Sequence, residues 1–336
     1  SFDRSKYKNF NFLSDLDNLG IISIGNYGVF QNEIDKLDNN QKIKELNNLI
    51  KLRPFNPDAL LAITDTYLQI KDFKKAAYYS SKLLAYTPKW DLAKNLNFSL
   101  IKYLDKQFTF SQNKLSVCII SKNEEHNISR CLSSIVDIVD EIIIVDTGST
   151  DNTLKIARRY TDKIYYYKWS NDFSAAKNKA LEHATCDWVL FLDCDEELAP
   201  GSRETLIEEM SASNIIGYRL PLENIGSPLN GFNYVPRLIR NAPGLHFIGK
   251  IHEQVFASML VLSGQWNMTQ EIGKTKILHH GYKPAELIKK DKLKRNLALY
   301  DDALLEFPDE PSLMMNYAHD LNHDGQTEKA YEIYKK

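Results

Sequence analysis

The chain has 336 residues, of which 43% are hydrophobic and 26% charged, and its formal net charge is −2. This length exceeds one ordinary hydrophobic core, so the composition predicts a globular protein of two or three domains and not a disordered chain. A charge so near zero gives no global attraction to nucleic acid or to an anionic membrane, and we expect neither partner. No apolar stretch approaches the roughly 20 residues that cross a bilayer, so no membrane segment is predicted.

The cysteines indicate a cytoplasmic protein. None of the cysteines belongs to a CxxC pair, which favours reduced, partly buried thiols over disulfides or a zinc site. The opening sequence SFDRSKYKNF lacks the apolar core of a signal peptide, and the missing initiator Met is typical of a trimmed N-terminus. The cysteines are Cys118, Cys131, Cys186 and Cys194.

Residues 1–110 have a helical pattern that contains one recognisable repeat. Pro54 recurs as Pro88, and the spacing 88 − 54 = 34 is the tetratricopeptide period. Apolar residues on both sides of Asp72 predict two helices joined by a turn at that residue. A single repeat cannot bury both of its faces, so we expect further helices beside it. These flanking helices are expected at 40–52 and 91–106.

The C-terminal stretch 286–336 resembles a second, incomplete repeat. Asp324 and Gly325 form its expected turn, and helical patterns lie on both sides. The pattern stops at Lys336 before the repeat is finished, so we expect that the chain is truncated there or that another element caps it. A plain helical hairpin is the alternative interpretation of both repeats.

Strand and helix patterns alternate between these helical segments. Short apolar runs rich in β-branched residues predict strands, and apolar residues at helical spacing predict the helices that join them. The alternation predicts an α/β fold with a mostly parallel sheet, helices on both of its faces, and helical repeats as flanks. Strands are expected at 115–120, 141–146, 163–169 and 188–193, and helices at 126–139, 152–160 and 172–184.

Polar residues leave these strands at their carboxyl ends, the edge at which open parallel sheets bind ligands. The exits read SKNEE (121–125), DTGSTD (146–151) and DCDEEL (193–198). Gly148 permits a tight turn and a close approach to a ligand, with an ordinary capped loop as the alternative. The patterns GxxxxGK[ST] and GxGxxG are absent, which disfavours P-loop and dinucleotide-binding functions.

The last exit places Asp193 and Asp195 directly after a buried strand, with Glu196 and Glu197 behind them. Crowded carboxylates repel one another, and burying one without a partner is costly. Either all of them reach water or a cation belongs among them. Mg²⁺ and Mn²⁺ prefer oxygen ligands and bridge to substrate phosphates, so we expect a divalent ion that holds a diphosphate.

Together these stretches resemble a family 2 glycosyltransferase with the GT-A fold, a Rossmann-like α/β architecture. The resemblance is carried by SVCIISKNEEHNISRCLSSI, DEIIIVDTGSTDNT and WSNDFSAAKNKALEHATCDWVLFLDCDEEL, and later by FIGKIHEQV and ILHHGYKP. It covers residues 115–285, which we expect to form the transferase domain. Within the family, the sequence is most similar to enzymes with helical repeats, among them the S-glycosyltransferases of sublancin-type glycopeptide bacteriocins.

The resemblance implies a nucleotide-sugar donor, UDP-linked in most members, and inversion at the anomeric carbon. It places uracil on Asp146 and the divalent metal on Asp195, with His279 completing the metal site. Asp193 would contact either the ribose or the metal. Lys177 stands where the family usually has Arg, which keeps the charge but loses the bidentate fork. The donor-binding residues implied are Ser121, Asn123, Glu124, Asp146, Gly148, Asp172, Lys177, Asn178, Asp193 and Arg237.

The general base is expected within the GKIHE stretch, with Glu253 as first choice and His252 as second. The alternative is that His252 is a structural hydrogen-bonding residue and Glu253 binds sugar hydroxyls. For a cysteine acceptor the base matters less, because a thiol ionises far more readily than an alcohol. Arg237 and Arg240 are three residues apart, so in a regular strand at most one of them meets the diphosphate.

We therefore expect a metal-dependent enzyme that transfers a sugar to a Cys, Ser or Thr side chain of a peptide or protein. The helical repeats offer a concave surface for such an acceptor, or they form a homodimer contact. One alternative keeps the enzyme but makes the acceptor a glycan or a lipid carrier. Another is an inactive transferase fold that serves as a repeat-based binding scaffold, and a nucleotidyltransferase is the least supported. The sugar, the acceptor residue and the oligomeric state are left open.

Overall fold

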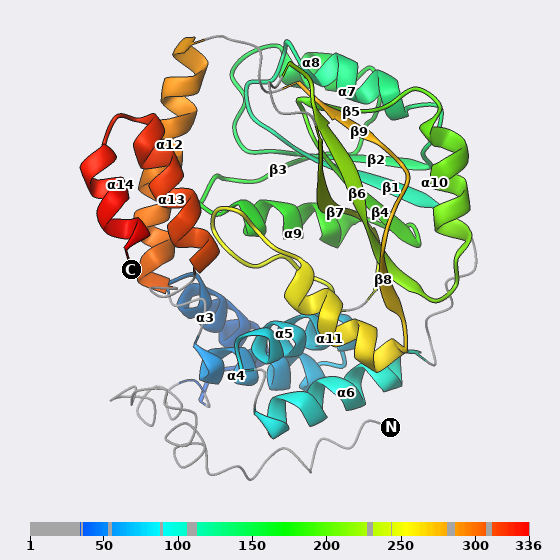
Figure 1. Ribbon diagram of the computed structural model, residues 1–336. Helices are drawn as coiled ribbons and strands as arrows, with labels where there is room; N and C mark the ends of the chain where they lie inside the picture. Colours follow the sequence, from blue (N-terminus) through cyan, green and yellow to red (C-terminus); the bar gives the residue numbers. More distant parts are fainter. Residues whose placement is uncertain are drawn as a thin grey trace. The chain divides into compact units, whose positions relative to one another are not determined.

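The protein is described from a computed structural model, in which the chain divides into two compact units (Figure 1). Unit 1 comprises Ser1–Phe110, Ala242–His246 and Ala257–Met268. Unit 2 comprises Ser111–Asn241, Phe247–Phe256 and Thr269–Lys336. The residues that the structure describes are 34, 36–52, 56–87, 90–105, 113–226, 231–242, 244–280, 286–306 and 311–335.

The predicted N-terminal hairpin is present in unit 1 as helices α4 and α5. Asn56 caps the first of them, since its side-chain oxygen accepts hydrogen bonds from the backbone N–H groups of Asp58 and Ala59, each at 3.0 Å. Asp72 caps the second at the predicted turn. Pro54 and Pro88, which define the repeat period, lie outside the described residues. The helices are α3 (Asn39–Leu52), α4 (Pro57–Gln69), α5 (Phe73–Tyr86), α6 (Asp91–Asp105) and α11 (Phe256–Trp266).

A later segment of the chain, residues 242–246, packs within unit 1. His246 is fully buried there, with its Nδ1 2.9 Å from the carbonyl oxygen of Gly244 and its ring edge-on to Tyr78. Gly244 has a φ of +91°, and a Cβ at this position would lie 2.3 Å from Ser81 Oγ. Only glycine suits this position, because both the backbone conformation and the close approach exclude a side chain.

The sheet belongs to unit 2, and its strands run in the order β3-β2-β1-β4-β7-β6-β9-β5, with β8 paired to β6. The four predicted strands are confirmed, although β3 is shorter than the range 163–169. The strands are β1 (Leu115–Ser121), β2 (Glu141–Asp146), β3 (Ile164–Tyr166), β4 (Trp188–Asp193), β5 (Glu196–Leu198), β6 (Ile215–Asn224), β7 (Phe232–Arg240), β8 (Thr269–Ile272) and β9 (Ile277–His279).

Only the first half of the sheet is parallel throughout. Strands β3, β2, β1 and β4 pair in parallel, as predicted, but β7 runs antiparallel to β4, and β6 runs antiparallel to β7. In the parallel half, Ser121 pairs with Asp146, and Ile120 pairs with Asp193. The carboxyl ends of β1, β2 and β4 therefore meet at one edge of the sheet.

Helices cover both faces of the parallel half, as the unbroken apolar strands predicted (Figure 1). Alternate strand residues such as Val117, Ile144 and Leu190 share one buried cluster with side chains of α7, α8 and α10. Helix α9 packs against β1 and β2. The helices of unit 2 are α7 (Ile128–Ile135), α8 (Thr153–Ala157), α9 (Phe173–His183), α10 (Ser202–Ser211), α12 (Glu286–Glu306), α13 (Pro311–His323) and α14 (Thr327–Tyr334).

The C-terminal helices α12, α13 and α14 form a second cluster within unit 2. The turn predicted at Asp324 and Gly325 joins α13 to α14, and Gly325 has a φ of +84°. Ile251, far from these helices in sequence, is buried in the same cluster, and Trp169 and Phe173 pack against it. Its buried members are Ile251, Leu299, Tyr300, Ala303, Leu313, Tyr317, Ala318, Leu321 and Ala330.

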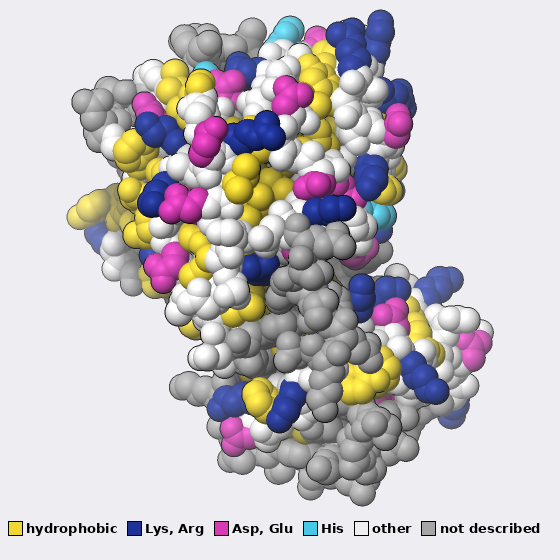
Figure 2. Space-filling model, turned by 90° about the vertical axis from the view of Figure 1, so that its right-hand side faces the viewer, with side chains coloured by type: hydrophobic (Ala, Val, Ile, Leu, Met, Phe, Trp, Pro, Cys, Tyr) yellow, Lys and Arg dark blue, Asp and Glu magenta, His cyan; other side chains and the backbone are white. Residues whose placement is uncertain are grey.

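Charged side chains of both signs are mixed among the described residues on the face that Figure 2 shows. There, Lys and Arg side chains lie among Asp and Glu side chains, with apolar groups between them. This mixture agrees with the small net charge of the chain. None of the helices that the structure describes combines the length and hydrophobicity needed to cross a membrane.

His246 should make the stability of the protein depend on pH. Burial lowers the pKa of His246 from 6.5 to about 4, and nearby Lys82 adds to this. The unfolded chain therefore takes up a proton first, so stability is full above pH 6.5 and falls as the pH drops toward 4. By pH 4.5 this one group should cost about 2–3 kcal/mol of unfolding free energy.

Chemical denaturation of His246→Phe at pH 7 and pH 4.5 measures this contribution. The variant should lose less stability between the two pH values than the unaltered protein does. Exposed His126, exchanged in the same way, is the control and should keep the full pH dependence. Equal pH dependence in all three proteins would contradict the assignment.

Candidate active site

The carboxylate of Asp146 shapes the loop that follows β2. It is buried and accepts hydrogen bonds from Ser121 Oγ at 3.1 Å and from the backbone N–H groups of Gly148 and Ser149, both at 2.9 Å. Gly148 has a φ of +111°, a conformation that side chains rarely adopt. The structure thus brings Ser121, Asp146 and Gly148 together, with Asp146 bonded to its own loop. Its contact with uracil stays a prediction.

Asn123 and Glu124, which were also predicted to bind the donor, join the loop after β2 to the loop after β1. Asn123 Oδ1 accepts a hydrogen bond from the backbone N–H of Thr150 at 2.8 Å, and the Asn123 N–H donates to Ser149 Oγ at 3.0 Å. The N–H of Glu124 donates to Thr153 Oγ1 at 2.7 Å. Asn123 itself is in the left-handed region, with a φ of +54°. The two loops therefore form one rim at the carboxyl edge of the sheet.

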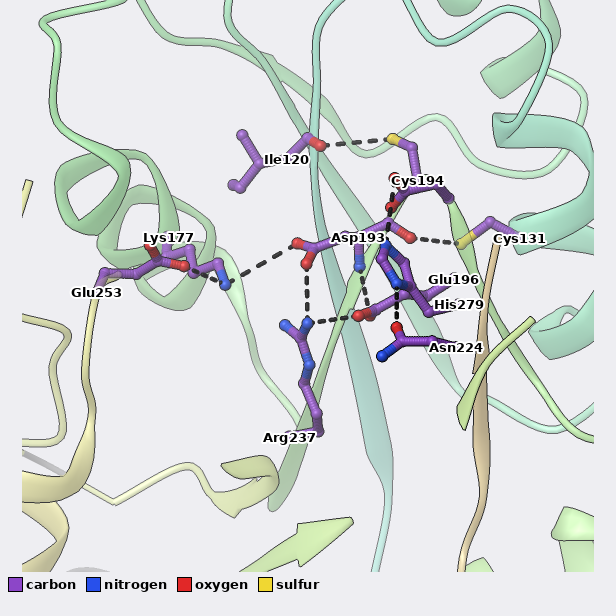
Figure 3. Close-up of polar contacts among 11 residues, drawn as sticks. Ile120, Cys131, Lys177, Asp193, Cys194, Glu196, Asn224, Arg237, Glu253 and His279 are labelled. Atoms are coloured by element: carbon purple, nitrogen blue, oxygen red, sulfur yellow. Dashed lines mark hydrogen bonds and ion pairs between the residues drawn. The ribbon is translucent and has the colours of Figure 1, made fainter. Parts of the chain in front are cut away.

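Asp193 lies at the end of β4 between two cations (Figure 3). Its Oδ2 is 2.8 Å from Arg237 Nη2, and its Oδ1 is 3.9 Å from Lys177 Nζ. The same Arg237 nitrogen lies 2.5 Å from Oε1 of the fully buried Glu196. The crowded carboxylates after β4 are thus balanced by an arginine from the antiparallel strand β7 and a lysine from α9.

Burial and the nearby charges shift the pKa values of Asp193 and Glu196 in opposite directions. Partial removal from water would raise the pKa of Asp193, but Arg237 and Lys177 outweigh that effect and hold the pKa well below its usual range. Burial raises the pKa of Glu196, and although Arg237 opposes this rise, the neighbouring Asp193 charge adds to it. Asp193 therefore loses its proton at a lower pH than Glu196 does.

Lys177 connects Asp193 to the second predicted part of the site. The lysine is buried, and its Nζ lies 2.6 Å from Glu253 Oε1. The ammonium also lies 5.9 Å from the ring centre of Phe191 and 5.5 Å from that of Phe247, within the range of cation–π attraction. Lys177 thus bridges the strand end and the Glu253 carboxylate, which the sequence alone did not connect.

Asp195 and His279 form a separate pair beside this cluster. Asp195 Oδ2 lies 3.6 Å from His279 Nε2, and the interaction with Asp195 raises the pKa of His279. His279 Nδ1 lies 2.7 Å from Asn224 Oδ1, so Nδ1 carries a proton and Nε2 faces Asp195. The neighbouring His280 Nε2 lies 2.8 Å from Glu197 Oε1. The rest of the predicted H-x-G-Y motif, Gly281 and Tyr282, lies outside the described residues.

The expected divalent metal fits two of its three predicted ligands. Asp195 and His279 converge closely enough to share one ion, but the Asp193 carboxylate is turned to Arg237 and Lys177. Within the part of the chain that the structure describes, no three His, Cys, Asp or Glu side chains are arranged to hold a metal by themselves. Mg²⁺ commonly takes one or two protein ligands together with substrate phosphates, and the pair suits that mode.

Asp172 and Asn178, predicted to shape the donor pocket, both bond to backbone. Asp172 caps α9, with its Oδ1 accepting from the Ala175 N–H at 2.9 Å. Buried Asn178 makes two hydrogen bonds to Phe247: its Oδ1 accepts from the N–H at 2.7 Å, and its Nδ2 donates to the carbonyl at 2.9 Å. These residues fix the start of α9 and the chain that leads to Glu253.

Ile248–Gln254 is a closed loop, called the 248–254 loop below, that carries both base candidates. Backbone hydrogen bonds of 2.9 and 2.8 Å join Ile248 and Gln254 at its ends. His252 has a φ of +50°, and its Nε2 is hydrogen-bonded to the hydroxyl of Tyr300 on α12. Glu253 faces Lys177 instead (Figure 3). The structure therefore places only Glu253 beside the Asp193 cluster.

The two arginines of β7 also lie in different places. Arg237 lies at the site, whereas Arg240 is buried with its guanidinium 4.1 Å from the ring centre of Trp188 and donates to the Ala212 carbonyl. Sequence reasoning omitted Glu196, Asn224 and Tyr300 from the site. Glu196 could have been found, because its position in the acidic run already required a cation. No local sequence pattern marks Asn224 or Tyr300.

Removing Arg237 should destabilise the protein through the charge left behind. Arg237→Met leaves Glu196 buried without its cation, so the free energy of unfolding should fall by about 3–5 kcal/mol. Adding Glu196→Gln should restore most of the loss, and chemical denaturation measures both effects. Arg219→Met, on the neighbouring strand and exposed, is the control. Strictly additive effects of the two substitutions would contradict the pairing.

Comparison with known proteins places the middle of the chain in a family. Residues 116–257 match the family model described as Glycosyl transferase family 2. A TPR repeat-containing protein of Synechococcus elongatus is 31% identical over 226 residues, which cover 66% of this chain and 56% of that protein. The SPbeta prophage-derived glycosyltransferase SunS of Bacillus subtilis is 28% identical over 281 residues, which cover 82% of this chain and 65% of SunS.

The chain thus spans 56% and 65% of the lengths of these two relatives. Among solved structures, residues 1–349 of S. aureus TarS in complex with UDP-GlcNAc align with a TM-score of 0.41 and 16% identity, over 62% of this chain and 72% of that one. The family match and the α/β sheet agree with the GT-A class expected from the sequence. The chain therefore carries a glycosyltransferase domain of family 2 at residues 116–257.

Proposed function

We propose that the protein transfers a sugar from a nucleotide-sugar donor, UDP-linked, to a Cys, Ser or Thr side chain of a peptide or protein, with inversion at the anomeric carbon. The observation that carries this proposal is the bridge made by Lys177, which lies 2.6 Å from Glu253 and 3.9 Å from Asp193. This bridge connects the Glu253 carboxylate, which is suited to accept a proton, with the charged cluster around Asp193, which is suited to bind a diphosphate. Both lie at the carboxyl end of β4, where α/β sheets bind ligands.

The donor is proposed to lie along the carboxyl edge, with its base at the rim built around Asp146 and Asn123. Negative charge grows on the diphosphate as the bond to the sugar breaks, and Lys177 and Arg237 are the nearby cations that would stabilise it. Asp195 and His279 would hold Mg²⁺ or Mn²⁺, which when bound supplies Lewis-acid stabilisation of the same charge. Arg237 is already paired with Asp193 and Glu196, so its contribution to donor binding is weaker than that of a free cation.

Glu253 is the proposed general base. In the transfer step the acceptor oxygen or sulfur forms a bond to the anomeric carbon, and the bond to the diphosphate oxygen breaks. The acceptor proton goes to Glu253, and the electron pair of the broken bond leaves with the nucleoside diphosphate. Lys177 holds the Glu253 carboxylate beside the Asp193 cluster, where the donor diphosphate is proposed to bind.

A peptide or protein acceptor is favoured by the helical repeats. Repeat surfaces of this kind suit extended chains, and the SunS and TPR repeat-containing relatives align over much of this chain as well. A glycan or a lipid carrier is the competing acceptor, and an inactive scaffold is the competing function. The presence of Asp193, Asp195, Glu253 and His279 at one edge is a reason to favour activity over the scaffold.

Glu253→Gln should abolish most transfer while leaving donor binding nearly intact. The amide keeps the shape of the side chain but cannot accept the acceptor proton, so kcat should fall by roughly 10²- to 10⁴-fold. Steady-state transfer to a peptide library measures kcat, and calorimetry measures donor affinity. Glu182→Gln, an exposed acid of α9, is the control. A near-normal rate for Glu253→Gln on a hydroxyl acceptor would place the base elsewhere.

Metal removal should weaken donor binding and stop turnover. Chelator should lower the affinity for UDP-sugars, and added Mg²⁺ or Mn²⁺ should restore it, because the ion bridges the protein to the diphosphate. Asp195→Ala should behave like the chelated protein, with the exposed Asp162→Ala as its control. Donor binding without added acceptor separates this effect from catalysis. Full turnover in excess chelator would refute the role given to Asp195 and His279.

A further inference from the structure

Successive residues of the 248–254 loop contact two different parts of unit 2, the C-terminal helices and α9. Ile251 is buried in the cluster of α12, α13 and α14, and His252 is hydrogen-bonded to Tyr300. The next residue, Glu253, is paired with Lys177 at 2.6 Å. Because Ile251, His252 and Glu253 are consecutive in the chain, a displacement of His252 also displaces Glu253.

The conformation of this loop is not one that the backbone adopts by itself. His252 has a φ of +50°, which non-glycine residues seldom take, and such a residue persists only where surrounding contacts impose it. The ends of the loop are closed by the Ile248–Gln254 pair, and the carbonyl of Lys250 accepts from the Phe173 N–H at 3.0 Å. The bend at His252 itself is held by side-chain contacts with the C-terminal helices.

Tyr300 is built into the core of those helices. It is fully buried, its ring stacks on Tyr317 at 5.0 Å, and its hydroxyl bonds to His252 Nε2. Asp320 of α13 also interacts with this hydroxyl, and burial together with Asp320 raises the pKa of Tyr300. A carboxylate can only accept, so the phenol O–H donates a hydrogen bond to Asp320, and His252 Nε2–H donates to the phenol oxygen. Asp320 thus fixes the orientation of the Tyr300 hydroxyl, and the hydroxyl fixes the orientation of the His252 ring.

We propose that Tyr300 is a positioning residue of the active site, which holds Glu253 in its working place by anchoring His252. This inference rests on the proposed function, because it takes Glu253 to be the base. Tyr300 touches no proposed reacting atom and acts through His252 alone. The C-terminal helices are in this view part of the catalytic framework, in addition to any role in binding an acceptor.

The proposal is tested by comparing Tyr300→Phe with Tyr317→Phe in the full chain. Both substitutions remove one hydroxyl from a buried tyrosine of the same helical cluster. The Tyr317 hydroxyl, however, bonds to Asp301 of α12 at 2.7 Å and to Lys329 of α14 at 2.8 Å, and neither partner belongs to the loop. Tyr300→Phe should lower kcat about tenfold with the donor KM nearly unchanged, since a base displaced by a fraction of an ångström loses rate and not donor affinity. Tyr317→Phe should leave kcat unchanged.

Two further measurements exclude a general loss of structure. In a His252→Ala background, Tyr300→Phe should have little additional effect on kcat, because the interaction it removes is already absent. Amide hydrogen exchange at Ile248 and Gln254 should become roughly tenfold faster in Tyr300→Phe and stay unchanged in Tyr317→Phe. The exchange result does not depend on activity, so it stands even if the unaltered protein transfers no sugar, an outcome that would overturn the proposed function alone.

Equal losses of kcat and of melting temperature in both tyrosine variants would overturn the positioning role. So would additive effects of Tyr300→Phe and His252→Ala on kcat. Unchanged exchange at both loop amides in Tyr300→Phe would overturn it as well, whatever the activity.

Discussion

The site depends on one electrostatic constraint, which is that the carboxylates after β4 must be matched by positive charge. Glu196 is fully buried, and a buried acid without a partner would cost several kcal/mol. Arg237 meets this need by contacting both Glu196 and Asp193. Arg237 comes from β7, and the antiparallel pairing of β7 with β4 is what brings it to the strand end. The change from parallel to antiparallel pairing is therefore tied to the chemistry of this edge.

Lys177 extends this constraint to the 248–254 loop. A buried ammonium is as costly as a buried carboxylate, and Lys177 has both Asp193 and Glu253 within 4 Å. Its place on α9 is fixed by the Asp172 cap, and Asn178 on the same helix holds the backbone of Phe247. Residues that the sequence assigned to the donor pocket thus keep the helix and the loop in register, so that the two carboxylates share one cation.

Much of this arrangement follows from local sequence, and the rest does not. The runs at β1, β2 and β4 are apolar and β-branched enough to be recognised as strands, and their polar exits had to meet at the carboxyl edge of a parallel sheet. The contact partners of the key side chains could not be predicted in this way, because they lie far away in the sequence. Arg237 contacts a residue 44 positions away, His279 one 55 away and His252 one 48 away. Periodicity over a few residues holds no information about such pairings, because they depend on the antiparallel register of β6 and β7 and on the packing of α12.

The separation of His252 from Glu253 shows why adjacency in sequence is a poor guide to a shared role. Side chains of successive residues in an extended or turned segment point in different directions, so a single loop cannot present both to one acceptor. Here the left-handed bend at His252 directs its ring to Tyr300 while Glu253 faces Lys177.

The same bend buries Ile251 among α12 and α13, where Trp169 and Phe173 also pack. A chain cut at the expected domain boundary of residue 285 would expose that apolar surface to water, at about 25 cal/mol for each Å². The sheet and the C-terminal helices therefore make one folding unit, and the repeat pattern that resembles a separate module is in part the support of the active-site loop.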